Sequence, residues 1–292
     1  MSPVLRGGLL VVGSSACVAL DTIVARVVME EINPFVLVFF RNAFGLLFML
    51  PWLLRVGTRG LATHKPAIHV LRALAKIVAF IAFFWGLTRI PVADATAIVF
   101  ATPLFAAAGA ALWLGESLRG GRLSAILLGF LGVLVIVRPG LQVLDAAALA
   151  CVAAALGHAL VGLCVKYLSR HDPPNTIIAL NLLLSVPLAL LVALPFWTTP
   201  DASMLLLMAL QGLLGLGSQL FITRAMRLAD ASVMMPVDFV RLPMVAALAF
   251  AAFGELSDAW TWAGAAIIFC ATVLLLRAGA TRALAGPGPQ ER

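Results

Sequence analysis

Residues 92–116 of the chain are VADATAIVFATPLFAAAGAALWLGE, and residues 228–255 are LADASVMMPVDFVRLPMVAALAFAAFGE. Both segments begin with a short Ala-Asp-Ala motif, continue as an apolar run that contains proline, and end in Gly-Glu. A helix needs roughly 20 apolar residues to cross about 30 Å of hydrocarbon. The two segments therefore predict two related membrane-spanning helices.

The composition of the whole chain indicates that its solvent is a lipid bilayer. Of the 292 residues, 63% are hydrophobic and 11% are charged, against roughly 25% charged residues in a soluble domain. So few polar side chains could not cover a water-facing surface. The apolar residues form continuous runs and do not alternate with polar ones, which excludes a transmembrane β-barrel. We expect an all-α integral membrane protein.

Ten apolar runs along the chain predict transmembrane helices. They are Leu5–Met29, Pro34–Leu54, Ala67–Ile90, Val92–Leu114, Arg122–Val137, Ala146–Leu168, Thr176–Trp197, Ala202–Leu228, Ala231–Phe253 and Ala259–Leu276. These runs use most of the chain and leave no room for a soluble catalytic domain.

The positions of Lys and Arg predict the orientation in the membrane. If the N-terminus is inside, most basic residues at span ends are cytoplasmic, and only Arg26, Arg89 and Arg138 are on the other side. Short loops rich in Lys and Arg stay in the cytoplasm. We expect a multi-pass protein of the bacterial inner membrane with both termini in the cytoplasm.

The chain also repeats itself. Gly115-Glu116, after the fourth run, and Gly254-Glu255, after the ninth, are 139 residues apart. Each copy holds five helices, an odd number, so the second copy must be inverted relative to the first. Inverted repeats enclose the substrate site of many secondary transporters near the bilayer midplane. We predict a central cavity between a first repeat and an inverted one, followed by a cytoplasmic tail: residues 1–140, 141–280 and 281–292.

The ten spans, the duplicated five-helix unit and the two Gly-Glu motifs resemble the drug/metabolite transporter superfamily, in its EamA branch. Within that branch the chain is similar to bacterial amino-acid exporters of the YddG type, although no motif singles those out. The resemblance implies a helical bundle whose central cavity is lined by the third, fourth, eighth and ninth helices and by parts of the first and sixth, with the fifth and tenth helices at the periphery. It also implies transport of small organic metabolites without ATP hydrolysis.

The third predicted helix carries charged and aromatic residues on one face. Arg72, Lys76, Phe80 and Phe84 follow one another at steps of four residues, which places them in line. Lys76 falls near the midplane, where a charge costs at least about 2.5–3.5 kcal/mol. We interpret this face, with Trp85, as a cavity wall that binds a carboxylate beside an aromatic surface. Ordinary packing is the alternative for the phenylalanines alone.

Two pairs of opposite charges have two interpretations each. Asp21 and Arg41 lie at similar depth in the first two helices. One interpretation is a structural ion pair between them. The other is that Asp21 faces the cavity and binds either a substrate ammonium group or a coupling proton. Asp238 and Arg241 are three residues apart and pair on their own helix, or Asp238 bridges to the cations of the third helix.

Prolines and two polar residues complete the candidate site. Pro103 in the fourth helix and Pro236 and Pro243 in the ninth predict kinks in corresponding helices, a pattern that points to a transport site. His158 is either a hydrogen-bonded packing residue or a proton-sensitive cavity residue. Gln211 lies near the midplane, and we expect Gln211 and His158 to make polar contacts with the substrate.

The sequence contains no phosphate-binding loop, metal-ligand cluster or hydrolase motif, so we expect no metal, no cofactor, no nucleic acid and no enzymatic activity. We predict a monomeric secondary transporter, an exporter of amino acids including aromatic ones, that works by alternating access. Lys76 and Arg241 would bind the anionic end, and Asp21 or Asp238 the cationic end. The alternatives are another solute (a nucleoside, sugar, cationic drug or S-adenosyl compound), a passive channel and an intramembrane lipid-modifying enzyme.

Overall fold

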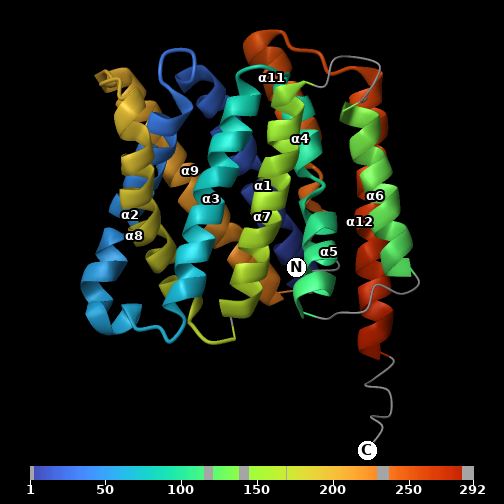
Figure 1. Ribbon diagram of the computed structural model, residues 1–292, viewed down its shortest axis with the longest axis horizontal. Helices are drawn as coiled ribbons and strands as arrows, with labels where there is room; N and C mark the ends of the chain where they lie inside the picture. The colour runs from blue at the N-terminus through green and yellow to red at the C-terminus, as the bar shows by residue number, and fades with distance from the viewer. Residues whose placement is uncertain (1–2, 115–120, 138–144, 169, 229–236, 285–292) are drawn as a thin grey trace, which may run out of the picture.

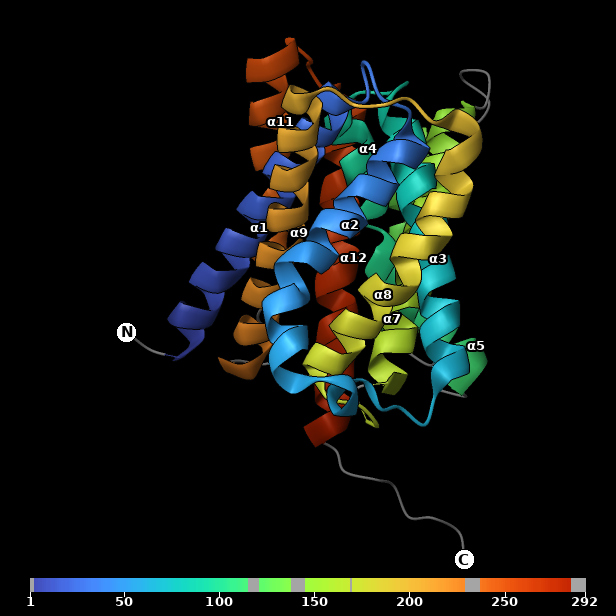
Figure 2. The same cartoon turned by 90° about the vertical axis from the view of Figure 1, so that its left-hand side faces the viewer.

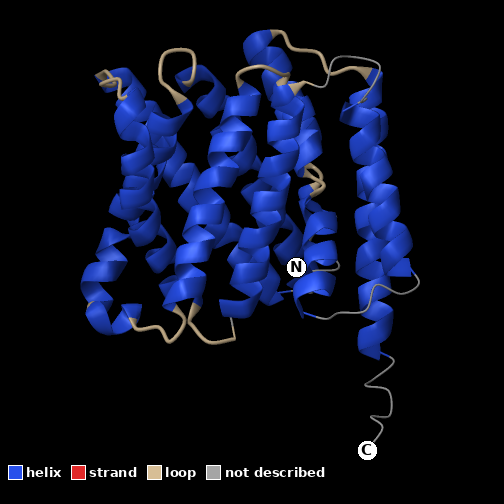
Figure 3. Ribbon diagram, viewed as in Figure 1, coloured by secondary structure: helices blue, strands red, loops and turns tan. Residues whose placement is uncertain are grey.

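The computed structural model describes residues 3–114, 121–137, 145–168, 170–228 and 237–284 (Figure 1). These residues form α-helices joined by short loops and two 3-10 turns, and no β-strand occurs among them (Figure 3). Four features singled out in the sequence lie outside the described residues: Gly115-Glu116, Arg138, the second Ala-Asp-Ala motif at residues 229–231, and Pro236.

The helices follow the predicted apolar runs closely. In the first half they are α1 (Pro3–Val28), α2 (Pro34–Val56), α3 (Pro66–Leu87), α4 (Val92–Val99), α5 (Thr102–Leu114) and α6 (Gly121–Val137), with a 3-10 turn at Thr58–Leu61. In the second half they are α7 (Ala146–Leu168), α8 (Pro174–Ala193), α9 (Ala202–Leu228), α11 (Arg241–Phe253) and α12 (Ala259–Leu284), with a 3-10 turn at Leu194–Phe196. α2, α3 and α8 each begin with proline, which is favoured at the first helical position because no N–H is needed there.

Seven of the described helical segments are long and apolar enough to cross a membrane. They lie in α1, α2, α3, α4 with α5, α7, α8 and α9. Shorter apolar helices cover Leu123–Val137, Arg241–Phe253 and Ala259–Leu275. The prediction of an all-α membrane protein is confirmed for the described part of the chain.

Two of the predicted spans are interrupted near their middle. α4 and α5 are separated by a break at residues 100–101, and Pro103 follows in the first turn of α5. In the second half a turn at residues 239–240 precedes α11, which carries Pro243 in its first turn. Because proline lacks an N–H and its ring clashes with the carbonyl four residues earlier, the helix cannot continue undisturbed.

Helices of the two halves pack against each other in pairs. α1 lies along α9 and α3 lies along α7, while α2 contacts α8 and α6 contacts α12 (Figures 1 and 2). The contact between α6 and α12 is close because glycines face each other there. A Cβ at Gly132 would lie 2.9 Å from the carbonyl oxygen of Gly264, so only a small residue permits this approach.

Many large apolar side chains point outward from the bundle. Leu112 is 87% exposed, and Leu54 and Leu206 are exposed to a similar extent. In water such a surface would be unfavourable, whereas hydrocarbon solvates it as well as a protein core does. The outer surface of the bundle therefore suits a lipid environment.

Candidate functional site

A cavity of about 470 Å³ lies inside the bundle. Side chains from both halves line it, and α6 is the one described helix that contributes none. The lining includes most of the candidate residues: Asp21, Arg41, Arg72, Lys76, Phe80, Phe84, Pro103, His158, Asp238 and Arg241. Trp85, Gln211 and Pro243 do not line it.

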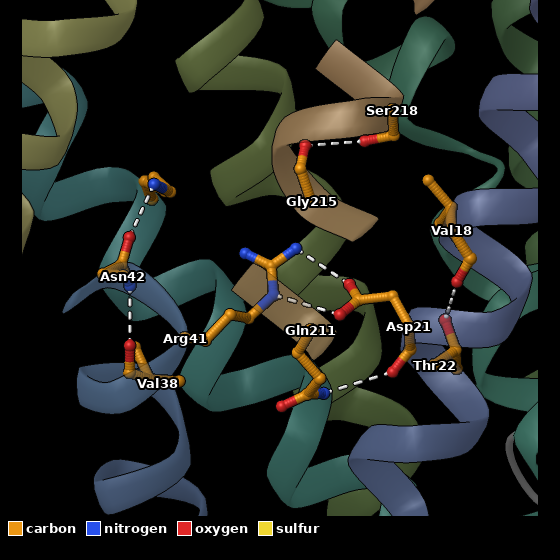
Figure 4. A network of polar contacts seen from close by, with 10 residues as sticks. Val18, Asp21, Thr22, Val38, Arg41, Asn42, Gln211, Gly215 and Ser218 are labelled. Carbon is orange, nitrogen blue, oxygen red and sulfur yellow. Dashed lines mark hydrogen bonds and ion pairs between the residues drawn. The ribbon is translucent and has the colours of Figure 1, made fainter. Parts of the chain in front are cut away.

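Asp21 and Arg41 form an ion pair in the wall of the cavity (Figure 4). The Arg41 Nη2 donates to Asp21 Oδ2 at 2.8 Å and the Nε donates to Oδ1 at 3.3 Å, and both side chains are largely buried. The amide Nε2 of Gln211 donates to the backbone carbonyl of Asp21 at 3.2 Å. Of the two interpretations of Asp21, the structure contains the ion pair with Arg41. Gln211 makes a hydrogen bond to α1 and does not line the cavity.

The two cations of α3 contact neutral groups. Lys76 Nζ donates to Asn42 Oδ1 at 2.8 Å, and Asn42 in turn donates to the carbonyl of Val38 at 2.7 Å. Arg72 Nη1 donates to the carbonyl of Ile177 at 2.7 Å. Among the described residues neither cation has a carboxylate within ion-pair distance.

Phe80 is surrounded by charged and aromatic groups. The guanidinium carbon of Arg41 lies 4.4 Å from its ring centroid and Lys76 Nζ lies 5.8 Å from it. The ring of Phe84 stacks on it at 5.6 Å, and the ring of His158 meets it edge-on at 5.4 Å. The step of four residues along α3 thus places a cation and two rings on one face of the cavity, as the helix geometry requires.

Asp238 and Arg241 pair with each other across the turn before α11. Arg241 Nη2 lies 3.2 Å from Asp238 Oδ2, and the hydroxyl of Ser15 donates to Asp238 Oδ1 at 2.8 Å. The guanidinium of Arg241 also lies over the ring of Phe100, 4.5 Å from its centroid. The local pair is therefore the one formed, and Asp238 makes no ion pair with Arg72 or Lys76 in this structure.

Trp85 was expected in the cavity wall, but its ring lies elsewhere. It packs under the guanidinium of Arg89, 3.9 Å from the ring centroid. Trp85 is one residue past Phe84, and one helical step rotates a side chain by about 100°. This rotation turns Trp85 away from the face that Phe84 shares with the cavity.

Several lining residues were not predicted from the sequence, above all Phe100, Phe239 and Asn42. The two phenylalanines are 139 residues apart, the spacing of the Gly-Glu motifs, and both lie beside a helix break. This spacing could have predicted both phenylalanines as lining residues from the sequence. Asn42 carried no comparable signal, because its partner Lys76 comes from another helix.

Glu255 connects helices at one end of the bundle. Gly254 adopts a left-handed conformation, with φ +67°, at the C-terminal end of α11, a position that favours glycine. The following Glu255 accepts a hydrogen bond from the backbone N–H of Val92 at 2.9 Å and pairs with Arg26 at 3.3 Å. The second Gly-Glu motif therefore joins α1 and the start of α4 to the second half.

The opposite end is tied together by Asp172. Its Oδ2 lies 2.8 Å from His69 Nε2 and accepts from the Thr63 hydroxyl at 2.8 Å, and both His69 and Asp172 are buried. Burial raises the pKa of Asp172, but the hydrogen bonds from His69 and Thr63 and the charges of His69 and His171 outweigh it, so that the pKa lies below its ordinary value. This contact links the start of α3 with the loop between α7 and α8.

The described residues contain no group of three His, Cys, Asp or Glu side chains that could hold a metal ion. Their arrangement instead suits the binding of an organic solute. Five phenylalanine rings line the cavity: Phe80, Phe83, Phe84, Phe100 and Phe239. Two orphan polar atoms, Asn181 Oδ1 and Thr272 Oγ1, belong to buried lining residues and have no hydrogen-bond partner among the described residues.

Comparison with known proteins gives a family match over nearly the whole chain. The sequence model described as the EamA-like transporter family matches twice, at residues 5–138 and 145–277. A solved crystal structure has the same fold, with a TM-score of 0.63 and 18% identity, over 95% of this chain and 98% of that one.

Two curated relatives are similar in sequence. A riboflavin transporter of Vibrio cholerae is 34% identical over 77% of each chain. An S-adenosylmethionine uptake transporter of Rickettsia prowazekii is 27% identical over 88% of each chain. Neither is named for amino acids or for export, so these relatives do not support the amino-acid exporter that the sequence led us to expect.

Proposed function

Because the chain belongs to the EamA-like transporter family, it is a membrane transporter of a small molecule and not an enzyme, and we propose that its cargo is a planar heteroaromatic metabolite of the riboflavin class. The observation that carries this proposal is the lining of the cavity. Five phenylalanine rings and the guanidinium groups of Arg41 and Arg241 line one space of about 470 Å³. Planar rings and guanidinium planes bind flat aromatic ligands by stacking.

The charges of the lining favour riboflavin over S-adenosylmethionine. Four cations (Arg41, Arg72, Lys76 and Arg241) and two carboxylates line the cavity. S-adenosylmethionine carries a sulfonium and an ammonium group against one carboxylate, so a cavity with excess positive charge repels it. Riboflavin is neutral, so the excess positive charge of the lining does not repel it.

The proposed mechanism is alternating access between two inverted repeats of five spans. Two separate family matches, one in each half, support the repeat. So does the pairing of helices, because exchanging the halves converts the contact of α1 with α9 into that of α7 with α3. α1 and α7 run in opposite directions in Figure 1, as an inverted repeat requires. Rocking of one repeat against the other would open the cavity alternately at each end.

We further propose that the protein works as a monomer in the bacterial inner membrane with both termini in the cytoplasm. Lys65 precedes α3 and Arg170 follows α7, and these two helix ends lie at the bundle end where α1 begins and α12 ends (Figures 1 and 2). Arg26 is in the last turn of α1 and Arg89 follows the end of α3, so both belong to the other end. The positive-inside rule assigns the first end to the cytoplasm. Glu255 would then close the outer end, and Asp172 would link the halves at the inner end.

The proposed function is tested with purified protein in liposomes. Uptake of riboflavin, S-adenosylmethionine and tryptophan is measured with and without a proton gradient. We expect saturable riboflavin uptake that an excess of unlabelled riboflavin blocks, and no uptake of the other two solutes. Uptake of S-adenosylmethionine or tryptophan without any movement of riboflavin would overturn the proposed cargo.

A further inference from the structure

Two cations in the cavity wall lack a counter-charge among the residues that the structure describes. The carboxylates of the lining belong to Asp21 and Asp238, and each already pairs with an arginine. Arg72 and Lys76 remain. They are one helical turn apart on the same face of α3, so both side chains reach the same part of the cavity.

The contacts of these two side chains provide hydrogen-bond acceptors but no negative charge to neutralise the two cations. Lys76 donates to the amide oxygen of Asn42 and Arg72 donates to the carbonyl of Ile177. Arg72 is only 7% exposed, and its Nε has no hydrogen-bond partner within the described part of the chain. The buried guanidinium of Arg72 therefore retains one N–H that no described residue satisfies.

Keeping these cations together is unfavourable without an anion. Arg41 and Lys76 both lie over the ring of Phe80, and Arg72 is one helical turn from Lys76, so these like charges repel one another. Charges removed from water need a partner of opposite sign. Arg41 is neutralised by Asp21, which leaves the charges of Arg72 and Lys76 to be balanced from elsewhere.

We propose that Arg72 and Lys76 form a subsite for an oxyanion, a carboxylate or a phosphate, inside the transport cavity. A guanidinium and an ammonium one turn apart present several N–H donors to such a group, and charge-assisted hydrogen bonds of this kind are strong. The inference deepens the proposed function, since it assigns part of the cargo site. The oxyanion is either carried by the cargo or binds as a free ion beside a neutral cargo.

The experiment compares two flavins that differ in one charged group. Binding of riboflavin and of riboflavin 5′-phosphate to the purified full chain in detergent is measured by quenching of flavin fluorescence. If the anion is part of the cargo, the phosphate ester binds about ten- to a hundredfold more tightly, and inorganic phosphate competes with it. If the anion is free, inorganic phosphate instead increases the affinity for riboflavin. Equal binding of both flavins, with no effect of inorganic phosphate, would overturn the subsite.

Variants assign the effect to the two residues. Lys76→Gln and Arg72→Gln each remove one charge, keep a hydrogen-bond donor, and are expected to abolish the difference in affinity that the phosphate group makes. Arg89→Gln is the matched control, because Arg89 is exposed and does not line the cavity. A phosphate effect that survives in both cavity variants would contradict the assignment.

A second readout separates failure of the subsite from failure of the flavin proposal. The melting temperature of the detergent-solubilised protein is measured with increasing inorganic phosphate and with no flavin present. We expect phosphate to raise the melting temperature of the wild type and of Arg89→Gln but not of Lys76→Gln. This result together with no binding of either flavin would retain the subsite and reject riboflavin as the cargo class.

Discussion

The ring of Phe100 stacks on the ring of Phe239, with centroids 4.4 Å apart and planes inclined by 25°. The two residues are 139 positions apart, the same spacing as the two Gly-Glu motifs. Each lies at an interruption of a helix, a few residues before a proline. Equivalent residues of two repeats can touch each other only near the axis that relates the repeats, so this stack supports the proposed symmetry at the cavity.

The stack predicts coupled effects of two substitutions. Phe100 is buried, and Phe100→Ala is expected to lower the free energy of unfolding by about 3 kcal/mol. Phe239→Ala should cost less, since Phe239 is partly exposed. Because both substitutions break the same contact, the double variant should lose about 0.5–1.5 kcal/mol less than the sum of the single losses. Unfolding in detergent measures all three values, and strict additivity would show that the rings do not interact.

A second prediction concerns the contacts of Glu255 at one end of the bundle. Its ion pair with Arg26 is partly exposed, and such pairs contribute about 0.2–1 kcal/mol. Glu255→Gln keeps an acceptor for the Val92 N–H, so the melting temperature should change little. Opening of that end of the cavity should become easier, with a change in transport rate of about two- to fivefold.

The control for the Glu255 prediction is Arg26→Gln, which removes the same ion pair from the other side. Transport rates in liposomes should change equally in Arg26→Gln, in Glu255→Gln and in the variant that carries both. A rate that responds to Glu255→Gln and not to Arg26→Gln would show that the ion pair is irrelevant to opening.

The contacts of Asp172 predict how stability depends on pH. Its pKa is lowered in the folded protein, so the ionised carboxylate stabilises the fold. That contribution is full above the unfolded pKa, about 3.9, and is lost as the pH falls through the lower folded value. Asp172→Asn should therefore reduce the melting temperature at pH 7, and this difference should begin to shrink only below about pH 4 and disappear below the folded pKa.

Melting of wild type and Asp172→Asn between about pH 2 and pH 8 measures this prediction. Glu31→Gln is the matched control, because Glu31 is an exposed carboxylate in the loop between α1 and α2. A difference between wild type and Asp172→Asn that persists unchanged at the lowest pH would exclude the carboxylate charge as its cause.

The aromatic wall predicts a loss of ligand affinity on truncation of Phe80. The ring supports Arg41 and stacks on Phe84, so Phe80→Ala removes part of the planar surface. Stacking of a heteroaromatic ring on an aromatic side chain contributes about 1–3 kcal/mol, which corresponds to roughly a five- to hundredfold weaker affinity. Fluorescence titration with riboflavin measures it. Phe48→Ala, an exposed ring outside the cavity, should bind as the wild type does, and equal binding by Phe80→Ala would remove Phe80 from the site.

The positions of the helices could be predicted from the sequence because each span is a continuous apolar run with its own start signal. Pro34 and Pro66 mark helix starts at or next to the predicted ones. The interruption at residues 100–101 could be anticipated from Pro103, since proline acts on its own helix. These features depend on interactions within a few residues, which periodicity and composition record.

The partners of the polar side chains could not be predicted in the same way. Lys76 meets Asn42 and Asp238 meets Ser15 because distant helices pack in a particular register. The depth of a charged residue in the membrane limits which residues can pair with it. For Asp21, depth was enough to predict the ion pair with Arg41. It does not give the rotation of a helix about its axis, which is why the assignment of Trp85 to the cavity was wrong.

The most direct test of the central claim, that two rocking repeats carry one solute through the cavity between them, is counterflow of riboflavin in liposomes. Proteoliposomes loaded with unlabelled riboflavin are diluted into a trace of labelled riboflavin, and uptake is followed over time. We expect transient accumulation of label above its equilibrium level, and a rate that saturates with external riboflavin. Uptake that never exceeds equilibrium and rises linearly with concentration would indicate a passive pore and would contradict alternating access.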